Sequence, residues 1–513
     1  MNTVCKWDYF EISYKVADIL NPFINSEKKA IFSTEDEQYE VKGFYDGDDI
    51  YTFRFMPQRE GKYHYEILNA DISGDFMCVG AAPGNKGMVQ VKDNTRLCYQ
   101  DNTPYQSLGT TCYAWIHQSE DLQKLTIQSL EESPFNKIRM CIFPKFFQFN
   151  ESEPVIYPYE RGERKGFDEK LEAQKEAYPI PVRCEGVPKD IKNFNYYKPN
   201  VDFYKALDKK ILKLKKLGIE ADLILFHPYD KWGFSSMNDE CNRLYLKYMV
   251  ARYSAFSNVW WSMANEYEIM GWPEEKWDAY GELVASEDIY GHMISIHNCF
   301  QYYDYKKPWI THCSMQRINL YHHVEETEQK IAEYGKPVVW DEIAYEGDVD
   351  QGWGNISGEE LTRRFWEAVL RGGYPGHGET YLTEDRILWW SHGGVLRGES
   401  HKRIAFLKKI IAEVPGGYLK YADGEADELV SIPADMEKEV TWFKQGFADY
   451  ELHYLGFGRP CCRYFKLPED RKYQIDVIDT WNMTIDNKGI FQGDCKVEMP
   501  RKEHMLIRLV RVD

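Results

Sequence analysis

Two pairs of polar residues, each directly after a short apolar run, supply the carboxyl groups in this chain that could do chemistry. Asn265 and Glu266 follow the run NVWWSMA, and Asp341 and Glu342 follow PVVW. Runs of this kind, with β-branched and aromatic members, are typical of strands buried on both faces of a parallel sheet. The sequence therefore predicts carboxyl groups at the C-terminal tips of two buried strands, where parallel α/β enzymes place their reacting groups.

Two carboxyl groups facing each other across a pocket are what cleavage of a glycosidic bond requires. One acid protonates the leaving oxygen, and the other attacks the sugar or activates a water molecule. The alternative is that each acid lies in a surface loop. A surface loop is a reasonable explanation for either acid taken alone. It is a poorer explanation for two matched acids, one of which follows an Asn. We therefore expect Glu266 and Glu342 to be the catalytic residues.

The elements that must hold these acids form a repeating pattern of short apolar runs and amphipathic helices. One helix, over 202–218, places Phe203 and Leu207 on one face and ends at Gly218, and another opens with a capping box at Ser357. Eight runs are expected to be strands: 107–115, 136–143, 220–228, 258–264, 292–298, 309–316, 336–342 and 376–382. Eight such alternations predict a (β/α)8 TIM barrel, because an open doubly wound sheet would not need matched acids on strands four and seven.

The flanking regions have period-2 alternation and turn signals instead. We predict three domains: an Ig-like antiparallel β-sandwich over 1–95, the catalytic barrel over 96–420 and a second β-sandwich over 421–513. Nothing singles out an aromatic face on the first, so a structural role is favoured over sugar binding. A long insertion, 146–199, follows the second strand and is rich in Tyr and Phe. We expect a lid over one end of the cleft.

Composition limits the partners. The 513 residues carry a formal charge of -19, which repels phosphate backbones and anionic lipid, so neither nucleic acid nor membrane is expected. No secretory signal and no apolar run of about 18 residues is present, which predicts a cytoplasmic protein. The 12 Cys show no metal-ligand spacing, and the chain has no GxGxxG after a strand. We expect neither a metal nor another cofactor, while a homo-oligomer stays open.

Four motifs resemble a known group, the clan A glycoside hydrolases, and most closely its apiosidase-type branch. They are LILFHPYDKWGF, VWWSMANEYE, VVWDEIAYEG and LWWSHGGVLRGES. The likeness extends over essentially the whole chain and implies a sandwich, a barrel and a second sandwich. It also implies a retaining mechanism, with Asn265 and Glu266 as the Asn-Glu acid/base of strand four, Glu342 as the nucleophile of strand seven and Arg139 as the arginine after strand two.

Physical chemistry gives each of these residues a role. Burial and the neighbouring carboxylate are expected to keep Glu266 protonated near neutral pH. The positive charge of Arg139 is expected to keep Glu342 ionised. Asn265 can donate a hydrogen bond to the sugar 2-hydroxyl, and retention requires carboxyl groups about 5 to 5.5 Å apart.

Six further residues are candidates for substrate binding. His227, His297 and His312 lie at or near strand ends and could bind sugar hydroxyls or orient Glu342. The other three lie in the last motif, where a Trp pair could form the floor under the sugar ring: Trp389, Trp390 and His392. The alternative for each His is a buried imidazole with its hydrogen bonds satisfied. A His metal site lacks the HExxH type of spacing.

The leading hypothesis is an exo-acting retaining glycoside hydrolase that trims imported plant- or glycan-derived oligosaccharides. A transglycosidase would use the same two glutamates. A non-catalytic carbohydrate-binding protein would keep the barrel without turnover, and the presence of both acids speaks against it.

Overall fold

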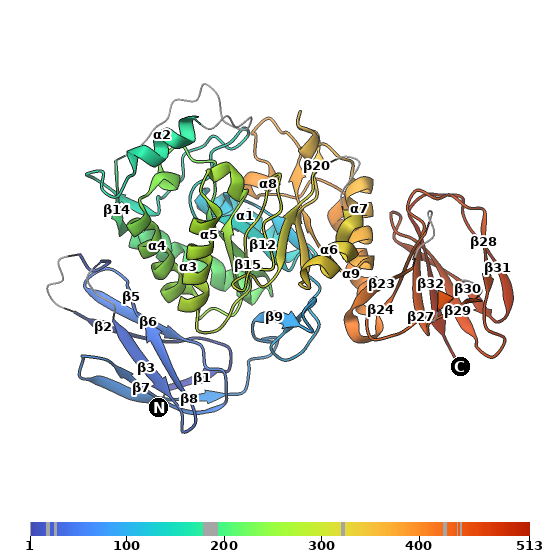
Figure 1. The fold of residues 1–513 in the computed structure, drawn as a ribbon, viewed down its shortest axis with the longest axis horizontal. Coiled ribbons are helices and arrows are strands. Elements are labelled where there is room, and N and C mark those ends of the chain that lie inside the picture. Colours follow the sequence, from blue (N-terminus) through green and yellow to red (C-terminus); the bar gives the residue numbers. More distant parts are fainter. Residues whose placement is uncertain are drawn as a thin grey trace.

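The computed structural model describes residues 2–16, 21–24, 28–177, 193–319, 324–423, 428–438, 440–441 and 444–513. Figure 1 shows three parts in a row, with N-terminal sheets at one end, a central α/β unit and C-terminal sheets at the other end. In this described part of the chain, no helix has both the length and the apolar character needed to span a membrane. The cysteines described are free thiols, most of them buried.

Eight parallel strands of the described residues form the central unit, in the order β17-β16-β15-β12-β11-β21-β19-β18. A parallel bridge between His297 and Ser314 joins the two ends of this order, so the ring is nearly closed. Each strand overlaps one of the predicted runs, and the predicted barrel is confirmed. The strands are β11 (Gly109–Thr111), β12 (Lys137–Cys141), β15 (Glu220–Phe226), β16 (Val259–Ala264), β17 (Ile294–Ser295), β18 (Cys313–Gln316), β19 (Val338–Glu342) and β21 (Tyr374–His377).

Helices alternate with these strands and end where local chemistry requires. Asn200 caps the helix that precedes β15, and that helix ends just before Gly218, whose φ of +71° suits glycine. The Ser357 hydroxyl accepts from the Glu360 N–H at 3.2 Å, which is one of the two hydrogen bonds of the predicted capping box. The helices are α1 (Glu120–Glu131), α3 (Val201–Lys216), α4 (Asp239–Tyr253), α5 (Glu274–Glu287), α6 (Thr327–Tyr334), α7 (Gly358–Leu370), α8 (Trp389–His392) and α9 (Ser400–Ala412).

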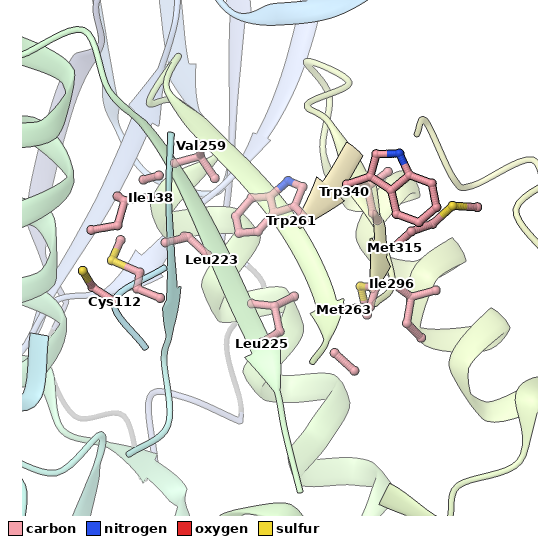
Figure 2. Packing of buried hydrophobic residues seen from close by; sticks show 14 of the residues in the cluster. Cys112, Ile138, Leu223, Leu225, Val259, Trp261, Met263, Ile296, Met315 and Trp340 are labelled. Carbon is pink, nitrogen blue, oxygen red and sulfur yellow. The ribbon is translucent and has the colours of Figure 1, made fainter. Parts of the chain in front are cut away.

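Alternate residues of the barrel strands form a packed apolar shell (Figure 2). Ile138, Leu223, Trp261 and Trp340 are fully buried in one cluster with helix residues such as Phe365. Replacing one buried Trp by Ala in such a core costs about 3 to 5 kcal/mol. Because these residues fill the space between strands and helices, the residues between them along each strand face the inside of the barrel.

An apolar cluster fills the lower part of the barrel interior. Trp260, Val339 and Tyr374 pack there with Leu97, and the Tyr374 hydroxyl accepts from the Leu97 N–H at 2.9 Å. Leu97 belongs to a hairpin of β9 (Val89–Lys92) and β10 (Arg96–Tyr99), which lies beneath the barrel in Figure 1. The hairpin therefore closes the end of the barrel opposite the predicted site. The predicted domain boundary at residue 95 falls between its two strands.

The N-terminal region consists of two sheets that share a core. Phe10 and Phe53 of one sheet pack in a single cluster with Phe32 and Phe76 of the other. The sheet orders are β1-β8-β7-β3-β4 and β2-β6-β5. The strands are β1 (Asn2–Cys5), β2 (Phe10–Lys15), β3 (Lys29–Ser33), β4 (Gln38–Lys42), β5 (Phe44–Tyr45), β6 (Ile50–Phe55), β7 (Gly61–Ile67) and β8 (Ile72–Val79).

The C-terminal sheet has the order β23-β24-β27-β32-β29-β30, with a separate ladder of β28 and β31. Arg508 ties it to the end of α9 through an ion pair with Glu413. The strands are β23 (Leu419–Asp423), β24 (Leu429–Pro433), β25 (Val440–Thr441), β26 (Lys444–Gln445), β27 (Tyr450–Tyr454), β28 (Cys462–Lys466), β29 (Tyr473–Asp479), β30 (Thr484–Phe491), β31 (Asp494–Glu498) and β32 (Met505–Arg511).

The insertion between β12 and α3 has secondary structure of its own. Its described residues form β13 (Tyr159–Arg161), α2 (Glu169–Ala177) and β14 (Phe194–Pro199), and β13 pairs with β14. Tyr159 and Phe194 pack against Phe234, in the segment after β15. Residues 178–192 of the predicted lid lie outside the described residues.

Candidate active site

Glu266 stands directly beyond the tip of β16 in an unusual backbone conformation. The ladder continues through Asn265, whose N–H donates to the Phe226 carbonyl at 3.0 Å. Glu266 then turns sharply, with φ 54° and ψ 60°. A residue other than glycine rarely adopts this left-handed conformation, and such strain clusters at functional sites.

The Glu266 carboxyl group is 7% exposed and is held by side-chain donors. Oε2 accepts from the Tyr229 hydroxyl and from the Asn265 amide at 3.0 Å. Oε1 accepts from the Gln316 amide at 3.4 Å. These contacts come from three different barrel strands or strand tips, so the surrounding barrel fixes the position of the carboxyl group.

A β-bulge places both Asp341 and Glu342 toward the barrel interior. In the ladder between β18 and β19, Met315 lies opposite Trp340 and Gln316 lies opposite Glu342, so Asp341 is the extra residue. Adjacent residues of a regular strand point to opposite faces, and a bulge interrupts that alternation.

Opposing effects act on the charge of Glu342. Burial raises the pKa of this carboxyl group to about 8, and a hydrogen bond from Tyr345 opposes the rise. Oε1 also accepts from the Tyr113 hydroxyl and lies 3.5 Å from Arg139 Nη1. A positive charge at that distance favours the carboxylate by about 4 kcal/mol at an effective dielectric near 20. His297 Nε2 lies 3.4 Å from the same oxygen.

A buried charge cluster, Lys137, Asp222, Asp341 and Arg139, lies beside Glu342 in the barrel. Lys137 Nζ donates to Asp222 at 2.8 Å and to Asp341 at 2.6 Å. Arg139 Nε is 3.6 Å from Asp222 and 3.7 Å from Asp341. Although burial opposes both charged forms, the neighbouring opposite charges raise the pKa of Lys137 and lower the pKa of Asp341. The cluster therefore positions the Arg139 guanidinium group beside Glu342.

A pocket of about 120 Å³ joins the two glutamates. Most of the residues lining it are aromatic, which suits stacking on a sugar ring. They are Tyr113, Lys145, Phe147, Tyr229, Glu266, Cys299, Phe300, Gln316, Ile318, Glu342, Tyr345, Trp353 and Trp390. Of the described residues in the insertion, Phe147 alone lines this pocket, and the rest of the mouth includes Phe300, Ile318 and Trp353. The lid stays a prediction.

Several of the predicted site residues come together here. Glu266, Glu342 and Trp390 line the pocket. Arg139 and His297 contact Glu342 instead of lining it. Asn265, predicted to bind the sugar, is 1% exposed and lies between Glu266, to which it donates, and the Tyr113 hydroxyl, 3.0 Å from its Oδ1.

The other predicted binding residues do not line the pocket. His227 contacts the Phe143 carbonyl at 3.0 Å, and the Trp389 indole donates to the Thr110 hydroxyl at 2.8 Å. His312 lies 3.0 Å from the Thr311 hydroxyl, and His392 lies 2.7 Å from the Ser391 hydroxyl. Burial lowers the pKa of His312 to about 3 and that of His392 to about 4. The rings of His312 and His392 are therefore buried neutral groups with local partners.

Sequence reasoning missed five polar residues of the pocket wall. Each of them lies at the end of a barrel strand or within four residues after it. They are Tyr113 after β11, Lys145 after β12, Tyr229 after β15, Gln316 at the end of β18 and Tyr345 after β19. Applying the strand-tip rule to every strand, and not just to those followed by acids, would have identified these residues.

Family models match three stretches of the chain. A model described as "Apiosidase-like, catalytic domain" matches residues 91–415. Two domains of unknown function, DUF5060 and DUF5605, match residues 3–70 and 440–510. No curated protein matches the chain.

Solved structures agree with these matches. A putative glycoside hydrolase from Bacteroides vulgatus ATCC 8482 is 33% identical, with 100% of each chain covered and a TM-score of 0.88. A glycoside hydrolase family 5 protein from the same organism is 15% identical, with 83% of this chain and 94% of that chain covered and a TM-score of 0.60, which shows a shared fold. The resemblance drawn from the four motifs is confirmed, and the chain belongs to the apiosidase-like catalytic domain family.

Proposed function

We propose that this protein is a retaining glycoside hydrolase in which Glu342 is the nucleophile and Glu266 the acid/base. The observation that carries the proposal is a single aromatic pocket lined by two buried carboxyl groups, each at the tip of a parallel barrel strand. Kinship with glycoside hydrolases supports the reaction class.

In the proposed first step, Glu342 attacks the anomeric carbon while the bond to the leaving oxygen breaks and Glu266 gives that oxygen its proton. In the second step, Glu266 takes a proton from water, the water oxygen attacks the anomeric carbon, and the Glu342 carboxylate leaves. Glu342 must start as a carboxylate. Arg139 and the Tyr113 hydroxyl, both in contact with Oε1, favour that form against burial.

Two side chains, Gln316 and His297, link the two carboxyl groups. The Gln316 amide donates to Glu266, its carbonyl oxygen lies 3.2 Å from His297, and His297 contacts Glu342. We propose for this pair the retaining separation of about 5 to 5.5 Å and not the roughly 6.5 to 9.5 Å of inverting enzymes. We therefore expect product with unchanged anomeric configuration, followed by NMR during hydrolysis of an aryl glycoside.

The test of the assignment uses aryl glycosides, including pentosides and apiosides. Glu342→Ala should lower kcat by more than about 10⁴-fold, because no covalent intermediate can form. Glu266→Ala should keep activity on substrates with good leaving groups, and added azide should raise it by replacing the attacking water. Wild-type turnover by Glu342→Ala would overturn the assignment. A transglycosidase would instead transfer the sugar to an added acceptor in preference to water.

We also propose exo action on oligosaccharides. The small pocket and the bulky side chains at its mouth, Phe147, Phe300 and Trp353, support binding of a single terminal sugar. An exo-acting enzyme releases one small product from a long chain. Mixed internal fragments from the same chain would contradict it. The cytoplasmic location stays a prediction.

The domain limits 1–95, 96–420 and 421–513, with a β-sandwich on each side of the barrel, are part of the same proposal. The family matches over 3–70, 91–415 and 440–510 support this division. The shared core of the two N-terminal sheets supports the first sandwich. Limited proteolysis should cut first in the stretches between the family matches, 71–90 and 416–439.

A further inference from the structure

Lys145 is a charged residue of the pocket wall that the proposed mechanism does not use. It lies four residues after β12 and is 4% exposed. Its ammonium group lies 3.5 Å from the ring centre of Tyr113, 4.3 Å from that of Tyr229 and 5.0 Å from that of Trp390. These cation–π contacts keep the ammonium group at one place on the wall.

The hydrogen-bond donors of Lys145 are unused. No hydrogen bond or ion pair to Nζ is formed by the residues that the structure describes. An ammonium group has three donors, and here they are left for a ligand in the pocket, which Lys145 lines. Burial lowers the pKa of Lys145 to about 8, so the group is still mostly a cation at neutral pH.

The two catalytic carboxyl groups have their own partners. Glu266 accepts from Tyr229, Asn265 and Gln316. Glu342 is contacted by Tyr113, Arg139 and His297. Neither forms a hydrogen bond with Lys145. Among the residues lining the pocket, Lys145 supplies the one fixed positive charge, and that charge faces the space a sugar would occupy.

We propose that the sugar bound in this pocket carries an anionic group, either the carboxylate of a uronic acid or a sulfate ester, and that Lys145 binds it. This inference rests on the proposed function and names its substrate class. Neutral hydroxyls can be bound by amide or hydroxyl donors, which are cheaper to bury than a cation. A charge-assisted hydrogen bond to an anion offsets that burial.

The negative charge of the whole chain does not oppose this assignment at short range. The formal charge of -19 repels an anionic sugar at a distance. At physiological salt, however, exposed charges are screened beyond about 8 Å. Inside the pocket, the nearby ammonium group therefore decides the sign of the local field.

The kinetic test compares substrates that differ only at C6. The 4-nitrophenyl glucuronide and galacturonide are set against the matching glucoside and galactoside, in both anomers, and the 6-sulfated glucoside forms a third arm. We expect wild type to favour an acidic substrate in kcat/KM by about tenfold or more. Lys145→Met should reduce that preference to near one, mainly through KM. Lys145→Arg should keep the preference. The acidic substrate with the higher kcat/KM, uronide or sulfate ester, identifies the anion.

A matched control separates loss of this charge from loss of a cation–π contact in general. Lys276 lies 3.9 Å from the ring centre of Trp272 and is not part of the pocket. Lys276→Met should leave the acid-to-neutral ratio unchanged. Lys145→Gln, checked by circular dichroism, replaces Lys145→Met if the latter fails to fold.

Binding measured without turnover keeps this inference distinct from the proposed function. Glu342→Gln is titrated by calorimetry with glucuronate and galacturonate, and with glucose and galactose. We expect the uronates to bind more tightly, to lose affinity above about pH 8 as Lys145 loses its proton, and to lose it with Lys145→Met added. That result without wild-type hydrolysis would sustain the inference and overturn the proposed function. Hydrolysis with equal or better use of neutral sugars, or a preference that survives in Lys145→Met, would overturn the inference alone.

Discussion

Two buried charge clusters, one in the barrel and one between the barrel and the N-terminal sheets, are satisfied to different degrees. The border cluster consists of Glu11, Asp46, Arg54, Asp208 and Arg252. Arg54 and Arg252 share the carboxylate of Asp208, and every guanidinium nitrogen of both arginines donates a hydrogen bond. In the barrel cluster, Nε and Nη2 of Arg139 have no hydrogen-bond partner among the described residues. Complete satisfaction suits a structural role, whereas unused buried donors call for an explanation in chemistry.

The clusters also differ in their access to water. The border cluster reaches the surface through Glu11 and Asp46, whose side chains are 39% and 21% exposed. In the barrel cluster, the side chains of Lys137 and Asp341 are each 1% exposed. A change of charge at the border can be relieved by water. In the barrel, the same change of charge alters the protonation equilibrium of the nearest ionisable neighbour, which is Glu342.

Removing one arginine from each cluster tests the difference between the two clusters most directly. Arg139→Met should lower kcat/KM by about 10²- to 10³-fold, because Glu342 loses the charge that favours its ionised form. Burial already holds the pKa of Glu342 at about 8, so losing Arg139 raises it further. Since activity requires the carboxylate, the acidic limb of the pH–rate profile should move to higher pH.

The matched control for that profile is Arg54→Met. It removes a buried arginine of the border cluster, so the position of the acidic limb should not change. A shift of equal size in both variants would show that the limb reports general loss of structure and not the charge on Glu342.

Removing an arginine of the border cluster should affect stability and not activity. Arg252→Met leaves the buried Asp208 with one arginine and should lower the free energy of unfolding by about 3 to 5 kcal/mol, while kcat/KM of the folded enzyme stays the same. Urea unfolding followed by tryptophan fluorescence measures this. Arg243→Met, which removes an exposed pair with Asp239 on the same helix, should cost less than about 1 kcal/mol. Equal losses would refute the structural role of the border cluster.

Between pH 7 and pH 5, acid sensitivity should come from buried histidines, because the carboxyl groups with lowered pKa values in the two clusters, Asp341 and Asp208, take up protons at lower pH. Burial lowers the pKa of His312 to about 3, so the unfolded chain binds a proton there more readily than the folded one. The associated stability is present above about pH 6.5 and falls as the pH drops, by about 2 kcal/mol at pH 5. His312→Asn should have a flatter stability profile between pH 7 and pH 5. His64→Asn, at a half-exposed side chain, should keep the wild-type slope.

The smallest expected effect on stability is at Glu11, a partly exposed member of the border cluster. Glu11→Gln removes a carboxylate 2.7 Å from Arg54 whose side chain is partly exposed. Because Asp208 and the Arg252 carbonyl still hold the arginine, the loss should be under about 1 kcal/mol. A loss as large as that of Arg252→Met would mean that water does not relieve this cluster.

The barrel could be predicted from sequence because its strands are buried on both sides, which makes their apolar runs continuous and easy to recognise. The same burial placed Glu266 and Glu342 correctly at strand tips. The inward position of Asp341 could not be predicted, since it depends on a bulge against β18 that has no local signal. The alternation of a regular strand would have sent one of the two adjacent acids outward.

Sequence reasoning also could not tell which of two adjacent side chains faces the pocket. Trp389 and Trp390 are equivalent in the sequence, but α8 directs one toward Thr110 and the other into the pocket. A helix this short has no periodicity from which to read its buried face. Lys145 was missed because it lies at the root of a long insertion, where a single basic residue predicts only a solvated loop.

The pairing of Arg54 with a distant helix also bears on how the protein is made. The Arg252 carbonyl that accepts from Arg54 lies 198 residues further along the chain. At about 5 to 20 residues per second, a ribosome needs roughly 10 to 40 s to cover that stretch. Until Asp208 is made, 154 residues after Arg54, Glu11 is the sole member of the border cluster already synthesised that binds Arg54. The exposed carboxylate thus serves as a first partner for the arginine until the barrel helices emerge.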